Sequence, residues 1–223
     1  MFSLACGCGV LAVAVRWWLR RTDGLGRPRP VPWYSLGLFA TLAIAAAVPV
    51  LRTAGEESRL SAVASALAGA PARVRCQSLG AAFIDTGAEL GFVRYGANGV
   101  PEHSTLIKHE QCGLLASYLA GGRASPPLNE VVAVHVLTHE SMHMAGLTSE
   151  SAAECAAVQR DARTAQLLGA TSAQGWRLAR LYWQLVYPEL PSDYQSPDCT
   201  PGGALDERLI DPPWAITGVD RAR

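Results

Sequence analysis

The chain has 223 residues, of which 49% are hydrophobic and 17% are charged, and its formal net charge is zero. Residues 1–52 carry six arginines and one aspartate, a net of +5, whereas the remainder carries twelve arginines, one lysine and eighteen acids, a net of −5. This division is typical of a basic region beside a membrane followed by a separate acidic domain. The acidic part has no basic patch with interleaved aromatic residues, which argues against a nucleic-acid partner. The preference for arginine over lysine is typical of a GC-rich bacterial genome.

Two apolar segments open the chain. Residues 32–51 form a stretch of 20 residues without a charged side chain, which is long enough to cross the hydrocarbon core of a bilayer. Trp33 and Tyr34 lie at its start, where interfacial aromatic residues occur. Residues 2–15 are apolar but shorter, and they extend to residue 19 only across Arg16. The segment 2–19 predicts either a first transmembrane helix or the hydrophobic region of a signal sequence.

Arginines between the two apolar segments predict the topology. Five of them lie in or directly before the loop 20–31, namely Arg16, Arg20, Arg21, Arg27 and Arg29. The positive-inside rule places this loop in the cytoplasm, so that the chain is exported again after the second segment. We therefore expect a membrane anchor over residues 1–52, a stalk helix over 53–72 and an extracytoplasmic domain over 73–223.

Four cysteines lie in the part that is expected to be exported, namely Cys76, Cys112, Cys155 and Cys199. An even number of cysteines suits disulfide formation in an oxidising compartment. None of them has the C-x-x-C spacing that is common among metal-binding thiols. Three pairings are possible, and the sequence leaves all three open.

The exported part mixes short strand patterns with longer helical ones. Strand character occurs over 73–79, 89–96 and 103–108, with turns rich in glycine and proline between them. Helices are predicted over 109–121, 128–145 and 151–168, and from Thr171 or Ser172 to Tyr187. The tail from residue 188 reads as loop. The predicted fold class is α+β, a mainly helical domain with a small antiparallel sheet, preceded by one or two transmembrane helices.

The helix over 128–145 contains His139-Glu140-Ser141-Met142-His143, the H-E-x-x-H pattern of zinc peptidases. Residues four apart share one face of a helix, so His139 and His143 can bind one metal ion. The residues before them are apolar nearly all round, which predicts a buried helix. Two buried histidines need partners, and a metal ion supplies them. The pattern therefore favours a Zn²⁺ site over a helix that merely carries two histidines.

The third ligand is expected from the next helix, which follows Gly146. Here the chain resembles the gluzincin metallopeptidases, whose second helix carries Glu-x-x-Ala/Ser-Asp. The resemblance covers about residues 128–155 and implies that Glu150 binds zinc while Glu154 hydrogen-bonds a ligating histidine. Glutamate replaces the usual aspartate at 154, and the gap between the two half-motifs is shorter than in most gluzincins.

Other interpretations of this segment stay open. Glu154 is an alternative direct ligand because it shares a helical face with Glu150. Glu154 also completes a capping box with Ser151, a role without metal chemistry. The short gap with Gly146 is similar to the metzincin motif too, but Ser149 stands where metzincins have a third histidine, and no methionine follows Met144.

The resemblance implies a zincin-like fold and a hydrolytic mechanism. Glu140 is the expected general base, acting on a water molecule that the metal activates. The developing oxyanion needs a further donor, for which the sequence offers Tyr187, Tyr194, Tyr182 and His135. His135 has a competing interpretation as an ordinary core histidine. An edge strand within 89–96 or 103–108 is expected to hold an extended peptide.

The predicted function is that of a membrane-anchored, extracytoplasmic zinc peptidase acting on a peptide or protein substrate. An alternative is a catalytically inactive, zinc-stabilised ectodomain used for binding or sensing, because motif residues can persist for structural reasons. A third interpretation is a membrane protein in which the helix pattern is accidental.

Overall fold

The computed structural model describes residues 2–20, 22, 25–28, 30–85, 87 and 89–214. The chain divides into two compact units, residues 1–55 and 56–223. Arg21 and Arg29, on which the predicted topology partly depends, lie outside the described residues, as does the end of the predicted tail, 215–223.

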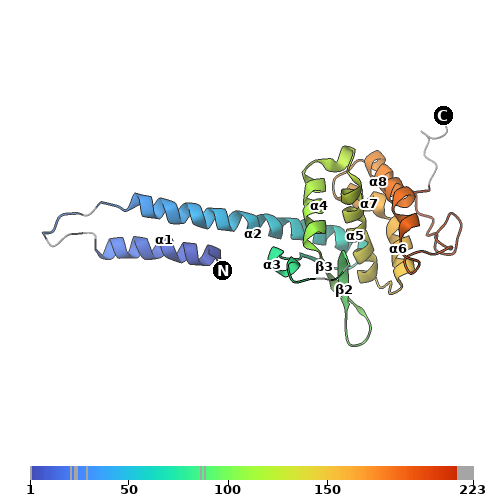
Figure 1. Ribbon diagram of the computed structural model, residues 1–223, viewed down its shortest axis with the longest axis horizontal. Helices are drawn as coiled ribbons and strands as arrows, with labels where there is room; N and C mark the ends of the chain where they lie inside the picture. Colours follow the sequence, from blue (N-terminus) through green and yellow to red (C-terminus); the bar gives the residue numbers. More distant parts are fainter. Residues whose placement is uncertain are drawn as a thin grey trace. The chain divides into compact units, whose positions relative to one another are not determined.

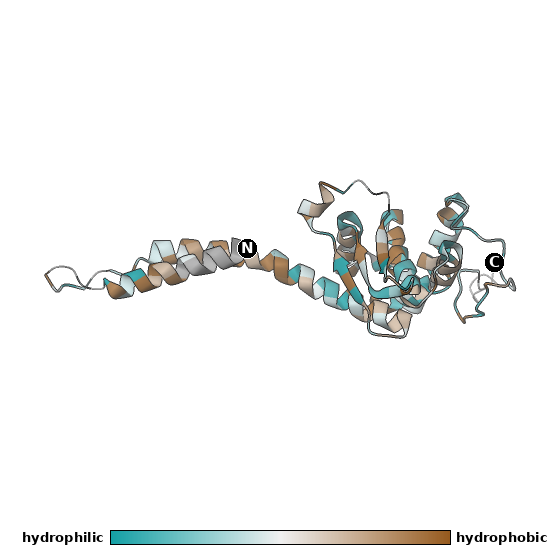
Figure 2. Cartoon of the chain, turned by 90° about the horizontal axis from the view of Figure 1, so that it is seen from below, coloured by the Kyte–Doolittle hydropathy of each residue, from teal (hydrophilic) through white to brown (hydrophobic). Residues whose placement is uncertain are grey.

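The first unit consists mainly of apolar helix. Helix α1 spans Phe2–Leu19, and helix α2 spans Trp33–Ala68 with Pro49 inside it. Among the described residues, α2 has the length and composition of a helix that crosses a membrane. Its N-terminal half is coloured largely as hydrophobic in Figure 2, and Trp33 and Tyr34 are exposed at its start. The predicted span 32–51 therefore coincides with the apolar half of one long helix.

Helix α2 continues into the second unit. From Glu56 onward it forms part of that unit, where Leu60, Val63 and Ala64 are buried in the hydrophobic core. The Ser61 hydroxyl accepts a hydrogen bond from the Val74 backbone N–H at 2.9 Å, which ties the helix to the following strand. The segment expected as a stalk is thus an extension of the apolar helix, and its second half packs into the domain.

The described residues form a sheet of three strands, β1 (Arg73–Cys76), β2 (Gly91–Tyr95) and β3 (Pro101–Ile107), in the order β1-β3-β2. Strands β2 and β3 form an antiparallel hairpin, whereas β1 pairs parallel with β3. The small sheet is therefore mixed, and the prediction of an antiparallel sheet is wrong for β1. Strand β2 pairs with one edge of β3, and β1 pairs with the other edge. Because β3 is the central strand, the prediction that 103–108 offers a free edge for a peptide is wrong, whereas 89–96 contains the edge strand β2.

Helix α5 (Leu128–Met144) is the long buried helix of the second unit, and other helices pack around it (Figure 1). The other helices of this unit are α3 (Leu79–Ala82), α4 (His109–Ala120), η1 (Gly122–Ala124), α6 (Glu150–Val158), α7 (Asp161–Leu167), α8 (Ser172–Leu185) and η2 (Tyr187–Glu189). Every residue of α5 from Ala133 to Met144 is buried, as its apolar sequence predicts. The α+β fold class is confirmed.

The helix predicted over 151–168 is two helices, α6 and α7, with a bend at Gln159 and Arg160. Gln159 is fully buried, and its amide donates to the backbone oxygens of Cys155, at 3.0 Å, and Leu205, at 2.9 Å. These bonds join the bend to the C-terminal tail. The bend was not predictable because a glutamine inside a helical pattern does not indicate a break.

Within the described residues two disulfides close the second unit. Cys76–Cys112 joins β1 to α4, and Cys155–Cys199 joins α6 to the tail. Of the three pairings that the sequence leaves open, the structure therefore has the one between sequence neighbours. The second bond holds the tail that follows η2 against the body of the domain.

Candidate metal centre

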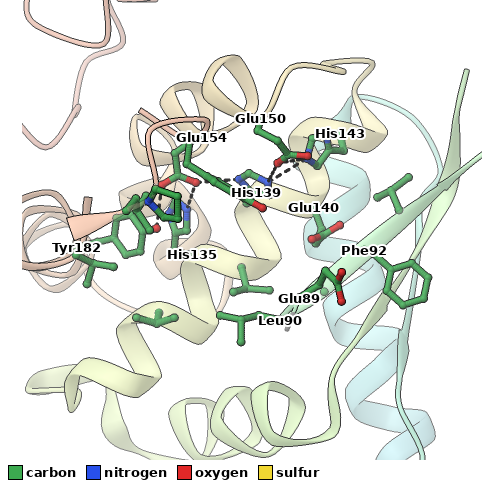
Figure 3. A pocket seen from close by; sticks show the side chains of 18 of the residues that line it. Glu89, Leu90, Phe92, His135, His139, Glu140, His143, Glu150, Glu154 and Tyr182 are labelled. Carbon is green, nitrogen blue, oxygen red and sulfur yellow. Dashed lines mark hydrogen bonds and ion pairs between the residues drawn. The ribbon is translucent and has the colours of Figure 1, made fainter. Parts of the chain in front are cut away.

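Three donor atoms converge at the C-terminal end of α5. His139 Nε2 lies 3.0 Å from His143 Nε2, and the Glu150 Oε2 atom lies 3.2 Å from the first and 3.3 Å from the second (Figure 3). Tetrahedral zinc with ligands at about 2.0–2.1 Å holds its ligand atoms roughly 3.3 Å apart. The spacing of the three atoms therefore fits one metal ion.

The other nitrogen of each imidazole is occupied by an acceptor. His143 Nδ1 lies 2.7 Å from the Leu147 backbone oxygen, and a carbonyl can only accept, so this Nδ1 carries a hydrogen. His139 Nδ1 lies 2.9 Å from the Glu154 carboxylate and is a donor for the same reason. In the neutral rings both Nε2 lone pairs then point at each other and at Glu150. Such lone pairs repel unless a cation, either a proton or a metal ion, lies among them, so the three atoms form a donor set that fits a metal ion.

The electrostatic environment attracts positive charge. Burial lowers the pKa of His139, but the carboxylates of Glu150 and Glu154 more than offset this and raise the value to about 9. The histidines in turn lower the pKa of Glu150, against the effect of its partial burial. The site therefore holds its acid in the ionised form in which carboxylates bind metal.

A tight turn brings Glu150 to the histidines. Helix α5 ends at Met144, and α6 begins at Glu150 after only five residues, 145–149. Gly146 adopts a φ of 105°, a left-handed conformation that side chains other than glycine rarely accept. This turn places Glu150 in the first turn of α6, with its side chain 40% exposed at the edge of the site.

Glu154 lies behind His139 instead of among the three converging atoms. Its Oε2 accepts from His139 Nδ1 at 2.9 Å and from His135 Nε2 at 3.0 Å, and its Oε1 accepts from the Tyr182 hydroxyl at 2.8 Å. The carboxylate is therefore used by side chains and forms no capping box with Ser151; the N-cap of α6 is Ser149, which makes no side-chain cap bond.

Among the residues that the structure describes, two overlapping groups of side chains could each hold a metal ion. One is His139, His143 and Glu150, and the other is the buried group His135, His139 and Glu154. In the second group every ring nitrogen has an acid as partner, because His135 Nδ1 also lies 2.8 Å from Asp161 Oδ2. The first group leaves lone pairs without a hydrogen-bond donor, and it opens onto a cavity.

Glu140 lines the same cavity, which has a volume of about 420 Å³. The side chain is 4% exposed, and burial raises the pKa of Glu140 to about 7. The Thr105 hydroxyl shares its one hydrogen between Glu140 Oε2, at 3.3 Å, and the Phe92 backbone oxygen, at 3.0 Å. The carboxylate is thus held between α5 and the sheet, facing the histidine pair (Figure 3).

Tyrosines differ in whether they reach this cavity. Tyr194 lines it with its ring 5.8 Å from that of His139, and among the described residues its hydroxyl has no hydrogen-bond partner. Tyr187 does not line the cavity, and its hydroxyl is hydrogen-bonded to the Ser196 backbone instead. Tyr182 and His135 line it but are engaged with Glu154. Of the predicted oxyanion donors, Tyr194 has a hydroxyl available to a ligand.

Sequence reasoning missed two side chains at the site. Tyr95, at the end of β2, lines the cavity with its hydroxyl 3.4 Å from His143 Nδ1. Thr105, from the central strand, holds Glu140. The aromatic residue at the end of the strand pattern 89–96 was the available indication for Tyr95, whereas nothing in the sequence singles out Thr105.

Comparisons with models of protein families, with curated proteins and with solved structures found no match for the chain. What the structure shows is a buried His/Glu group that could hold a metal ion, in a domain closed by disulfides and preceded by an apolar helix.

Proposed function

We propose that the chain is a membrane-anchored, extracytoplasmic, zinc-dependent peptidase. The observation that carries the proposal is the convergence of His139, His143 and Glu150 on one point beside the buried carboxylate of Glu140. Two imidazoles and one carboxylate form the donor set of catalytic zinc sites, which keep a further position open. An inactive, structural zinc site would instead be closed by a fourth protein ligand.

The residues around the ligands have the roles that hydrolysis requires. When bound, zinc supplies a Lewis acid that activates water and polarises a carbonyl group. Glu140 takes the proton from the water and delivers it to the departing amine, and Thr105 keeps its carboxylate in place. The Tyr194 hydroxyl donates to the developing oxyanion, because it lies at the cavity and has no other partner among the described residues.

The cavity favours an extended peptide with an apolar side chain. Aliphatic residues contribute to the lining of the cavity, namely Leu90, Val132, Val136, Val186 and Leu190. Strand β2 runs along the cavity, and among the described residues its one strand partner is β3. A peptide can therefore add to the free edge of β2 by backbone hydrogen bonds while it places one side chain among the aliphatic residues.

The anchor and the compartment follow from different features. Helix α2 supports a membrane anchor by its length and composition, and the two disulfides support an oxidising compartment for the domain. The arginines of the loop 20–31 place that loop in the cytoplasm. Alkaline phosphatase fused after residue 223 should be active, because this enzyme folds only on the exported side. An inactive fusion would contradict the proposed topology and indicate the opposite one.

The enzymatic proposal is tested with the full-length chain purified in detergent. Wild type should bind about one zinc ion per chain and hydrolyse members of a peptide library with apolar residues. Glu140→Gln should retain the zinc and lose the hydrolysis, whereas His139→Ala should lose both. Zinc-loaded wild type without activity on the library would reject the peptidase and favour the binding or sensing ectodomain. A wild type that binds no zinc would reject the metal centre itself.

A further inference from the structure

A buried chain of four side chains extends from the metal centre into the core. Asp161 Oδ2 lies 2.8 Å from His135 Nδ1, His135 Nε2 lies 3.0 Å from Glu154 Oε2, and the same oxygen lies 2.9 Å from His139 Nδ1. All four residues are buried, with Asp161 at 0% and His135 and Glu154 at 2% exposure. They come from α5, α6 and α7, so this series of hydrogen-bonded side chains joins three helices.

The partners of His135 determine which of its ring nitrogens carry a hydrogen. Both nitrogens of His135 face carboxylate oxygens, which accept hydrogen bonds when ionised. His135 Nε2 therefore carries a hydrogen and donates it to Glu154.

The orientation of His135 is fixed as well. Its ring stacks on the Tyr182 ring with 3.6 Å between centroids and 13° between planes. The Tyr182 hydroxyl in turn donates to Glu154 Oε1 at 2.8 Å. Glu154 thus accepts three hydrogen bonds, from His135, His139 and Tyr182, and neither of its oxygens remains free to turn toward a metal ion (Figure 3).

We propose that His135 is a positioning residue for the metal centre. Asp161 holds the His135 ring at Nδ1, so that the Nε2–H group of His135 fixes the Glu154 carboxylate. Glu154 in turn holds Nδ1 of His139, which leaves the Nε2 lone pair of His139 directed at the position proposed for the ion. The proposal rests on the metal-binding half of the proposed function and not on peptide hydrolysis.

Loss of His135 acts on the metal through Glu154. Without the Nε2–H donor, the Glu154 carboxylate, which is 2% exposed, loses one of its three hydrogen bonds. The carboxylate is then held by two hydrogen bonds instead of three, and His139 is held less firmly in the tautomer that binds metal. Partners of ligating histidines typically contribute 10–100-fold to metal affinity.

A double-mutant cycle separates this role from ordinary core packing. Zinc affinity is measured on the full-length chain in detergent, by competition with a chelator. His135→Phe keeps the stacking on Tyr182 and should weaken zinc binding by roughly tenfold. In a Glu154→Gln background the same substitution should cause little further loss, because the residue through which it acts is already altered. His135→Gln, which keeps an N–H near the position of Nε2, should restore most of the affinity.

Val134→Ala is the matched control. Val134 is fully buried on the same helix and packs in the hydrophobic core, outside the series of four hydrogen-bonded side chains. It should lower stability without changing zinc affinity. Equal losses from His135→Phe in both backgrounds, or no loss in the wild-type background, would overturn the proposal.

A second measurement needs no substitution at His135. Nitrogen-15 spectra of the histidine rings in the zinc-loaded wild type should show a hydrogen on His135 Nε2 at neutral pH. A His135 Nε2 without hydrogen would overturn the proposal even if the variants fail to fold. Neither measurement uses peptide hydrolysis, so a protein that binds zinc but hydrolyses nothing would reject the peptidase and leave this inference standing.

Discussion

Alanine at position 91 would press on the carboxylate that we propose as the general base. Gly91 begins β2, and a Cβ atom there would lie 3.1 Å from both Cγ and Oε1 of Glu140 and 3.3 Å from its Cδ. Carbon atoms in ordinary contact are about 3.5–4.0 Å apart. Glu140 lines the cavity, which offers room on the side away from Gly91, so Gly91→Ala should displace its carboxylate by roughly 0.3–0.5 Å.

The expected cost follows from this displacement. A misplacement of about 1 Å can reduce catalysis roughly a hundredfold, so a shift of this size should lower kcat by about five- to tenfold. Zinc content should not change, because the contacts of the added atom are with Glu140 and not with His139, His143 or Glu150.

The assay compares kcat on a peptide substrate with zinc bound per chain. Gly113→Ala is the matched control, because Gly113 lies inside α4 with no atom within 4 Å of an added Cβ. That change should leave kcat unaltered and stabilise the helix by up to about 1 kcal/mol. An unchanged kcat in zinc-loaded Gly91→Ala would refute the reasoning, since it would show that the reaction does not depend on where Glu140 lies.

Three further outcomes test the site and the fold. Glu150→Ala should weaken zinc binding more than Glu154→Ala in equilibrium dialysis, because Glu150 meets both Nε2 atoms; the reverse order would make Glu154 the ligand. Tyr194→Phe should lower the peptidase kcat by roughly a hundredfold with little change in KM, while Tyr187→Phe should leave kcat unaltered; equal effects would remove Tyr194 as the oxyanion donor. Replacing Cys155 and Cys199 together with alanine should lower the free energy of unfolding in urea by about 4 kcal/mol, given a separation of 44 residues, and a loss below about 1 kcal/mol would contradict this estimate.

The parts of the site that the sequence predicted depend on local periodicity. His139 and His143 share a helical face whatever the rest of the chain does, and Gly146 indicates where that helix ends. The resemblance to gluzincins then distinguished Glu150 from Glu154, and the structure places the first among the imidazole Nε2 atoms and the second behind His139. Residue spacing alone left both acids as candidates.

The parts that the sequence did not predict depend on contacts between distant residues. The parallel pairing of β1 with β3 joins residues about 30 positions apart, and no turn pattern indicates it. Thr105 meets Glu140 across 35 positions, and Asp161 meets His135 across 26. Each of these side chains is unremarkable in its own segment, and its role is defined only by the tertiary fold.

The short connection between α5 and α6 also bears on the order of assembly. Both imidazoles and the acidic groups that serve them lie between residues 139 and 154, on two helices joined by five residues. Contacts between near neighbours form early, since little chain entropy is lost in closing the intervening loop. During synthesis from the N-terminus, this helical pair is complete while the segment that bears Tyr194 and Cys199 is still to come. Under the proposed function, a nascent chain can thus acquire its ion first, and the Cys155–Cys199 disulfide then holds the segment that bears Tyr194 beside a centre that is already filled.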